Sequence, residues 1–168
     1  MITEWFPETK KVGLLFCSAE PNSRYQIEEV AKYLADKGIE SKEFAFTDTN
    51  DVTAVTQAAA DYADVIYIPT DNTAAANTEA IANVLIPAKV PAICGEEGIC
   101  SGCGVATLSI SYYDLGVTTG KMAAKILTGE ADISAMAIEY TNATKKYNAA
   151  TCDALGIKPL DGYTAIGE

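Results

Sequence analysis

The hydrophobic and polar positions of the chain follow two alternating patterns. Residues 12–17 form an unbroken apolar run, which is typical of a parallel strand buried on both faces. Apolar residues spaced for one face of a helix then run from Ile27 to Leu34 and stop before Gly38, a residue type that commonly ends a helix. The first 38 residues therefore predict one strand followed by one amphipathic helix.

The same unit repeats along the chain. Four further strands are predicted at residues 39–46, 64–69, 90–94 and 105–109, and three further helices at 50–62, 73–88 and 112–127. Regular alternation of strands and helices favours a parallel sheet covered by helices on both faces, with right-handed crossovers. We therefore predict an α/β fold with a flavodoxin-like, three-layer parallel sheet in the order 2-1-3-4-5.

The pattern changes after Gly129. Residues 133–140 are predicted to form an extended strand and residues 149–155 a short helix that ends at Gly156, whereas residues 160–168 show no usable periodicity. We therefore predict a ligand-binding α/β lobe over residues 1–130 and a separate terminal segment over residues 131–168.

Polar side chains follow four of the predicted strands where each strand ends. Because ligands of open α/β sheets bind beyond the carboxyl ends of the strands, we expect these side chains to line a ligand site. Carboxylates suit an ammonium group, hydroxyls and helix N-termini suit a carboxylate, and tyrosine faces suit an apolar portion, so the expected ligand is small and zwitterionic or hydroxylated. The candidate ligand-binding residues are Ser18, Glu20, Asn22, Ser23, Thr70, Asp71, Asn72, Thr73, Glu96, Glu97, Tyr112 and Asp114.

Each polar group taken alone has a simpler structural interpretation. Asn72 or Thr73 would cap the helix that follows it. Glu96 and Glu97 would form a solvated turn, and Tyr112 would pack at the start of a helix. The coincidence of polar residues at four strand ends favours the ligand site.

Composition and charge exclude several classes of protein. The 168 residues are 49% hydrophobic and 21% charged, which suits one globular domain with its own core. A net charge of −11 argues against nucleic acid as a partner. Histidine is absent, which removes the usual general base and the commonest metal ligand, so we expect neither an enzyme nor a metal or other cofactor. No apolar run approaches a membrane span, and the N-terminal residues 1–11 lack the apolar region of a signal peptide.

Cys100 and Cys103 form a C-x-x-C motif, which is compatible with a redox pair, half of a zinc site or a local disulfide. A zinc site would need further ligands, from Cys17, Cys94, Cys152 or carboxylates. A thioredoxin-type motif would open a helix directly after the first strand, which this motif does not. An exposed loop disulfide or free thiols are therefore favoured over catalysis or metal binding.

Five short segments together resemble a known family. They are SAEPNS at 18–23, PTDNT at 69–73, GEEG at 95–98, YYDLG at 112–116 and TGKMA at 119–123. In order and spacing they resemble the ABC-transporter substrate-binding proteins of the type I periplasmic-binding fold, in the group associated with tryptophan and tyrosine uptake. The resemblance runs from residue 5 to residue 157, and the C-x-x-C motif departs from it.

The resemblance implies an extracytoplasmic solute-binding component of an ABC importer, in which two lobes close by hinge bending on an aromatic amino acid. The chain would be the second lobe, with the first lobe and a lipoprotein signal outside it, and residues 131–168 would cross the hinge. The implied partners are the N-terminal lobe and an ABC permease. The implied location is the extracellular face or periplasm, as a membrane-anchored lipoprotein. Without the first lobe, apolar residues after Gly129 favour a homodimer.

The resemblance also implies roles for the site residues. Asn22 and Ser23 would meet the ligand carboxylate. Asp71, with Thr70 and Asn72, would hold the ammonium group. The rest of the wall would come from Glu96 or Glu97 with Tyr112 and Asp114.

Two other functions stay open at this point. A flavodoxin-like or receiver-like regulatory domain would share the fold, but a receiver needs acidic residues after strand one, where this chain has Cys17 and Ser18, and a lysine after strand five, where the first lysine is Lys121. A small-molecule enzyme could use Asp71 and Glu96 as its acid and base, although no nucleophile motif accompanies them.

Overall fold

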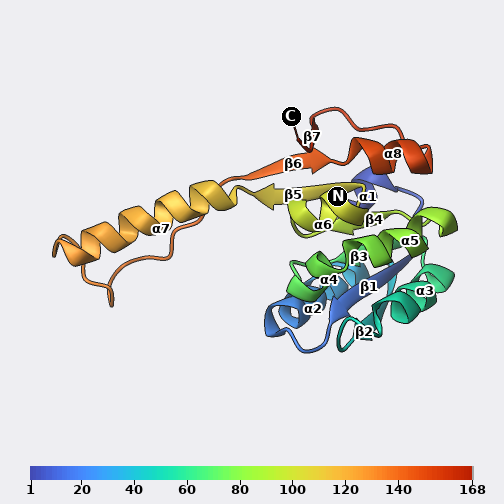
Figure 1. Cartoon of the computed structure of the whole chain (residues 1–168), viewed down its shortest axis with the longest axis horizontal. Coiled ribbons are helices and arrows are strands. Elements are labelled where there is room, and N and C mark those ends of the chain that lie inside the picture. Colours follow the sequence, from blue (N-terminus) through green and yellow to red (C-terminus); the bar gives the residue numbers. More distant parts are fainter. Residues whose placement is uncertain (168) are drawn as a thin grey trace.

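A mixed β-sheet forms the centre of the molecule (Figure 1). In the computed structural model, which describes residues 1–167, the strands lie in the order β2-β1-β3-β4-β5-β6-β7. The strands are β1 (Lys11–Cys17), β2 (Glu40–Phe46), β3 (Val65–Ile68), β4 (Ala92–Cys94), β5 (Ala106–Ile110), β6 (Ala143–Tyr147) and β7 (Thr164–Ala165). Strands β1 to β5 are parallel, which confirms the predicted order 2-1-3-4-5. Strand β6 adds to β5 in the antiparallel direction and β7 pairs in parallel with β6.

Helices cover both faces of the sheet and give the three-layer arrangement (Figure 1). One face carries α1 (Ile2–Trp5) and α2 (Pro21–Asp36), and the other carries α3 (Val52–Tyr62), α4 (Asn72–Ala76), α5 (Thr78–Ala88) and α6 (Glu97–Cys103). Strand β1 is apolar throughout its second half because it serves both cores: Leu15 packs toward α3 and α5, whereas Leu14 and Phe16 pack toward α2.

Residues 111–142 project away from this body as an arm. Helix α7 (Tyr112–Leu127) leaves the end of β5 and extends away from the sheet, and the chain returns along it to β6 (Figure 1). No residue of α7, all of which the structure describes, is buried. The return segment lies against α7 through Ile133, Met136 and Ile138, which line a shallow groove with Met122 and Ile126.

The structure corrects three predictions about the elements. Residues 133–140 form no strand, because their apolar side chains lie along α7; the strand is β6, whose sequence ATKKY is too polar to be recognised as one. The single helix at 73–88 is two helices that meet at Asn77, which ends α4 and begins α5. Residues 97–103 are helix α6 rather than a loop.

Residues near the C-terminus pack against the N-terminal helix α1. Helix α8 (Ala149–Leu155) was predicted correctly and ends at Gly156 in the left-handed region. Lys145 of β6 forms an ion pair with Glu4 of α1 at 2.8 Å, and the Tyr163 hydroxyl donates to the same carboxylate at 2.9 Å. Within residues 1–167, no helix combines the length and apolar character needed to cross a membrane.

Candidate functional site

Four polar segments lie together at one edge of the sheet, where β1, β3, β4 and β5 end. We call residues 18–23, 70–73, 95–98 and 109–114 the carboxyl edge. Parallel pairing places these ends side by side, with Ile68 of β3 opposite Cys94 of β4. Hydrogen bonds join each segment to the next: Asn22 to Thr70, Thr70 to Gly95, and Glu97 to Ser109.

The backbone of Thr70 joins the segments after β1 and β3. Its carbonyl oxygen accepts from Nδ2 of Asn22 at 2.9 Å and from Oγ of Ser23 at 3.3 Å. Its N–H donates to Oε1 of Gln26 at 3.1 Å. Gln26 was missed as a site residue, although its place one helical turn after Asn22 puts both side chains on one face of α2.

Asp71 lies beneath this edge and is 2% exposed. One carboxylate oxygen accepts from the backbone N–H of Cys17 at 2.7 Å and the other from that of Ala74 at 2.8 Å. The side chain therefore caps α4 and fastens it to the end of β1. Both oxygens are bound to backbone and closed off from solvent, so these contacts give Asp71 a structural role; its predicted contact with a ligand ammonium stays a prediction.

Glu20 reaches from the β1 segment to the start of α4. Its carboxylate accepts from the backbone N–H and side chain of both Asn72 and Thr73, at 2.8–2.9 Å. Partial burial raises the pKa of Glu20, but the hydrogen bonds from Asn72 and Thr73 outweigh it and lower the pKa to about 2. Glu20 is therefore ionised at neutral pH and holds the β1 and β3 segments together.

Gly95 brings the end of β4 against the end of β3. A Cβ atom at this position would lie 2.7 Å from the Thr70 nitrogen and 2.8 Å from the Pro69 carbonyl carbon, so only glycine fits. Next to it, the Glu96 carboxylate accepts from the backbone N–H groups of Gly98 and Ile99 and caps α6.

Glu97 joins the segments after β4 and β5. Its backbone N–H donates to Oγ of Ser109 at 3.1 Å, and its carboxylate forms an ion pair with Lys146 of β6 at 2.7 Å. Lys146 was missed because β6 was not recognised as a strand. With Glu20, Asp71 and Glu96 nearby, the edge carries more carboxylates than the one lysine neutralises, which favours a ligand with a positive group.

Tyr112 and Asp114 lie where the arm begins. Burial and the negative charge of Glu96 raise the pKa of Tyr112. Tyr112 is 55% exposed. Asp114 is exposed on α7, where its backbone N–H donates to Oγ of Ser111. The structure thus places Tyr112 at the first position of α7, directly after the end of β5, and Asp114 one half-turn further along the same helix.

Several polar groups of the edge are open to solvent. Ser18, Asn22 and Asn72 are exposed, and Thr70 and Thr73 are half-buried. These amides and hydroxyls supply N–H and O–H donors, which a ligand carboxylate needs, and oxygen acceptors, which a ligand ammonium group needs. Ser23, in contrast, is fully buried beneath Thr70.

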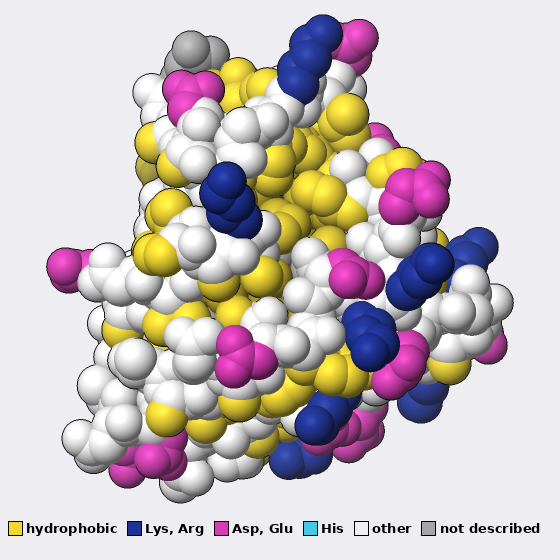
Figure 2. All heavy atoms as spheres, turned by 90° about the vertical axis from the view of Figure 1, so that its right-hand side faces the viewer, with side chains coloured by type: hydrophobic (Ala, Val, Ile, Leu, Met, Phe, Trp, Pro, Cys, Tyr) yellow, Lys and Arg dark blue, Asp and Glu magenta, His cyan; other side chains and the backbone are white. Residues whose placement is uncertain are grey.

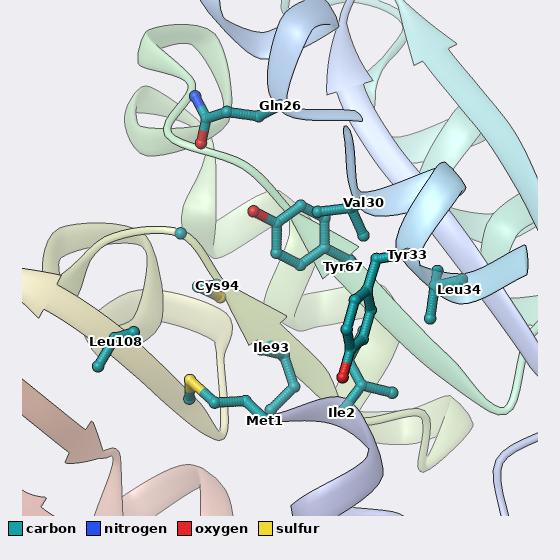
Figure 3. A pocket seen from close by; sticks show the side chains of 11 residues that line it. Met1, Ile2, Gln26, Val30, Tyr33, Leu34, Tyr67, Ile93, Cys94 and Leu108 are labelled. Carbon is teal, nitrogen blue, oxygen red and sulfur yellow. The ribbon is translucent and has the colours of Figure 1, made fainter. Parts of the chain in front are cut away.

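An apolar cavity of about 290 Å³ opens beside the carboxyl edge (Figure 3). Tyr67 of β3 lies in its wall with its hydroxyl on the side of Gln26, and burial raises the pKa of Tyr67 to about 12. Gly95 belongs both to this wall and to the edge. The other lining residues are Met1, Ile2, Val30, Tyr33, Leu34, Ile93, Cys94 and Leu108. Such a cavity can take an apolar or aromatic group.

A second hollow lies at the opposite end of the sheet, where the strands begin. Figure 2 faces this end and shows hydrophobic side chains running into the hollow. Its walls include Trp5, Val65, Pro91 and Ile157. It lies away from the hydrogen-bonded edge and is not part of the candidate site.

Of the two predicted alternatives for Cys100 and Cys103, the structure contradicts the exposed loop disulfide and agrees with free thiols. Cys100 and Cys103 lie on α6 and are at most 1% exposed, because this short helix packs its apolar face into the core. All five cysteines, which lie within the described residues, are free thiols. In residues 1–167 no group of three histidine, cysteine or acidic side chains is arranged to hold a metal ion.

Comparison with known proteins gives a family match. A family model described as "ABC transporter substrate binding protein" matches residues 1–159. Among curated proteins, a "Tyrosine-binding protein" from Clostridioides difficile (strain R20291) is 28% identical over 156 residues, which cover 92% of this chain and 45% of that protein.

Solved structures also resemble the chain over nearly its whole length. An ABC domain from Streptococcus pneumonia, solved in complex with L-Trp, is 27% identical and superimposes with a TM-score of 0.88 over 98% of this chain and 58% of its own. A conserved domain protein from Vibrio cholerae is also 27% identical, with a TM-score of 0.89 over 98% of this chain and 57% of its own. The chain thus spans about half the length of the relatives it matches.

Proposed function

Because the chain belongs to the ABC transporter substrate binding protein family, we propose that it is one lobe of a protein that binds an aromatic amino acid for import by an ABC permease. The family works outside the cytoplasm. The matched relatives are substrate-binding proteins and not enzymes, which confirms the prediction of a binding protein and removes the enzyme alternative. The family match also leaves no support for the receiver-like alternative.

The observation that carries the proposal is the continuous hydrogen-bonded carboxyl edge. Thr70 is linked to Asn22 and to the β4 end at Gly95, and Glu97 is linked to Ser109, so four strand ends form one preorganised wall. A wall whose own groups are already fixed loses little freedom when a small ligand binds.

An aromatic amino acid suits the charges and the shape of this site. The excess of carboxylates favours the ammonium group, and the apolar cavity beside Gly95 suits a ring. The relatives point the same way, since one is named as a tyrosine-binding protein and another was solved with L-Trp. An ABC permease would then receive the ligand.

The site residues divide into two groups in this proposal. The exposed Ser18, Asn22 and Asn72 contact the ligand, with Thr70, Thr73 and Tyr112 beside them. Glu20, Ser23, Asp71, Glu96 and Glu97 position the four segments through the contacts described above. Asp71 would thus support the ammonium-binding wall from below rather than touch the ligand.

The arm is the part of the chain that we assign to contact with a first lobe. It exposes large apolar side chains, among them Leu127, Ile133 and Ile138, which are 73–92% exposed. Exposed apolar surface of this kind marks an interaction site. The arm, rather than the whole of residues 131–168, would then lie across the hinge, because β6, α8 and β7 pack on the lobe itself. Without a first lobe, the same surface would favour a homodimer, and lipid anchoring would hold the two-lobed protein at the membrane.

The proposal predicts different affinities for one lobe and for two. Half of a closing cleft leaves the ligand in contact with water, so this chain alone should bind L-tyrosine, L-tryptophan or L-phenylalanine in the millimolar range, and the two-lobed protein should bind at least 100-fold more tightly, on the order of 3 kcal/mol. Isothermal titration calorimetry measures both. L-alanine and tyramine, which lack the ring and the carboxylate respectively, serve as controls. Equal binding of all these compounds, or micromolar binding by the monomeric chain, would contradict the proposal.

A further inference from the structure

Three thiols gather around the turn at residues 95–96. Cys94 ends β4, and Cys100 and Cys103 lie on α6, which begins immediately after the turn. Each of the three is at most 2% exposed. Cys94 also lines the apolar cavity beside the carboxyl edge, but the binding function described above gives no role to the three thiol groups.

The space at Gly104 shows how closely two of the sulfurs approach. A Cβ atom on Gly104 would lie 2.4 Å from Sγ of Cys94 and 3.2 Å from Sγ of Cys100. Both sulfurs therefore border the space that a side chain at position 104 would occupy, and any residue larger than glycine there would displace the Cys94 thiol. Hydrogen bonding between the Cys94 thiol and the sulfurs of Cys100 and Cys103, together with burial, raises the pKa of Cys94 well above its ordinary value.

Cys100 and Cys103 differ in their contacts. The Cys103 thiol donates to the carbonyl oxygen of Ile99 at 3.4 Å, within its own helix. The Cys100 sulfur instead adjoins the gap at Gly104 that Cys94 also borders. Of the two, Cys100 is therefore the better placed to react with Cys94.

We propose that Cys94 and Cys100 form a disulfide bond when the protein folds outside the cytoplasm. The family works in that location, where disulfides form and persist. The bond would close a short loop that contains Glu96 and Glu97 and would tie α6 to β4 beneath the carboxyl edge. The disulfide depends on the extracytoplasmic location of the family and not on which ligand binds. A failed disulfide test would therefore leave the proposed ligand-binding function intact, and a failed binding test would leave the disulfide intact.

The reaction requires an oxidant, for which a small disulfide such as oxidised glutathione suffices. The thiolate of one cysteine attacks the glutathione disulfide, forms a mixed disulfide and releases one glutathione thiol. The second cysteine attacks the mixed disulfide, completes the protein disulfide and releases a second glutathione thiol. The two protons lost by the cysteines appear on the two glutathione molecules, and the protein is oxidised by two electrons.

Burial decides when the bond can form. In the folded, reduced protein the thiols are closed off from solvent, and a buried thiol with a raised pKa provides little thiolate. Oxidised glutathione should therefore react during refolding, when the thiols are accessible, and hardly at all with the native reduced protein.

The test compares refolding of the reduced chain with and without a mixture of reduced and oxidised glutathione. After acid denaturation and treatment with N-ethylmaleimide, mass spectrometry should show three adducts for the oxidised protein and five for the reduced one, since the chain has five cysteines. Residues 90–121 contain no internal lysine or arginine, so cleavage after Glu96 or Glu97 is needed to separate Cys94 from the other two cysteines. The separated pieces should stay joined until a reductant is added.

Two serine variants and one control identify the partner. Cys100→Ser should abolish the bond, whereas Cys103→Ser should keep it, and Cys152→Ser serves as the control that keeps it. Five adducts after oxidative refolding would overturn the proposal. So would a bond that survives Cys100→Ser, or a stoichiometric zinc ion that protects the thiols in place of a disulfide.

Discussion

Replacement of Asp71 by alanine should destabilise the lobe strongly. The substitution removes both oxygens that accept from the backbone N–H groups of Cys17 and Ala74, and all these groups lie in a buried region. The end of β1 and the start of α4 would then each keep an unsatisfied donor.

The expected magnitude follows from these two bonds. Each buried donor left without a partner costs about 1–3 kcal/mol, and the loss of a helix cap lies in the same range. Because one of the two bonds is itself the cap, we expect Asp71→Ala to lower the free energy of unfolding by about 3 kcal/mol. Asp71→Asn keeps one acceptor oxygen and should cost less.

Urea unfolding followed by circular dichroism measures the change. Asp48→Ala is a matched control, because the Asp48 carboxylate accepts from one backbone N–H, that of Asn50, in an exposed turn. Its cost should stay within about 0.5 kcal/mol. If Asp71→Ala left the unfolding midpoint unchanged and reduced only ligand affinity in the two-lobed protein, the structural role given to Asp71 would be wrong and direct ligand contact would be correct.

Two further changes test the packing of the edge. The pKa of Glu20 is lowered from 4.5 to about 2 on folding, so its stabilising contribution is present above pH 4.5 and lost as the pH falls toward 2. Glu20→Gln should therefore lower the free energy of unfolding by about 1 kcal/mol at pH 7, after allowance for solvent screening, and by almost nothing near pH 2. Urea unfolding measures both values, with Glu28→Gln at an exposed position as the control. Gly95→Ala should lower the free energy of unfolding by about 1–3 kcal/mol, because the new Cβ would meet the Thr70 backbone. Gly116→Ala in α7, whose Cβ would meet nothing within 4 Å, should be neutral or stabilising. Equal effects of the two substitutions would refute the close approach of Gly95 to Thr70.

The fold was largely predictable because its signals are local. The apolar run at residues 12–17 and the helical spacing from Ile27 to Leu34 each identify an element without knowledge of its neighbours. Strand β6 could not be found in this way, because its residues are polar and it is held by pairing with β5, which is a contact distant in sequence. The projection of the arm could not be predicted either, because the apolar spacing along α7 is that of an ordinary amphipathic helix packed on a sheet.

The positions of the site residues were predictable, but their contacts were not. The sequence places Glu20, Asp71 and Glu96 at strand ends, and it cannot show that their carboxylates are bound to backbone N–H groups. The spacing of Gln26 from Asn22 places both on one face of α2, but the contact of Gln26 with the backbone of Thr70 follows only from the folded structure. The burial of Cys100 likewise depends on how α6 packs.

The most direct test of the central claim is a nitrogen–proton correlation NMR titration of this chain with L-tyrosine, a method that detects millimolar binding. The amide signals that move should belong to the carboxyl edge, at residues 18–23, 70–73, 95–98 and 109–114, and to the neighbouring cavity around Tyr67. Tyramine should move them less. Signals that move only at the opposite end of the sheet, around Trp5 and Ile157, or no movement up to the solubility limit of L-tyrosine, would contradict the claim.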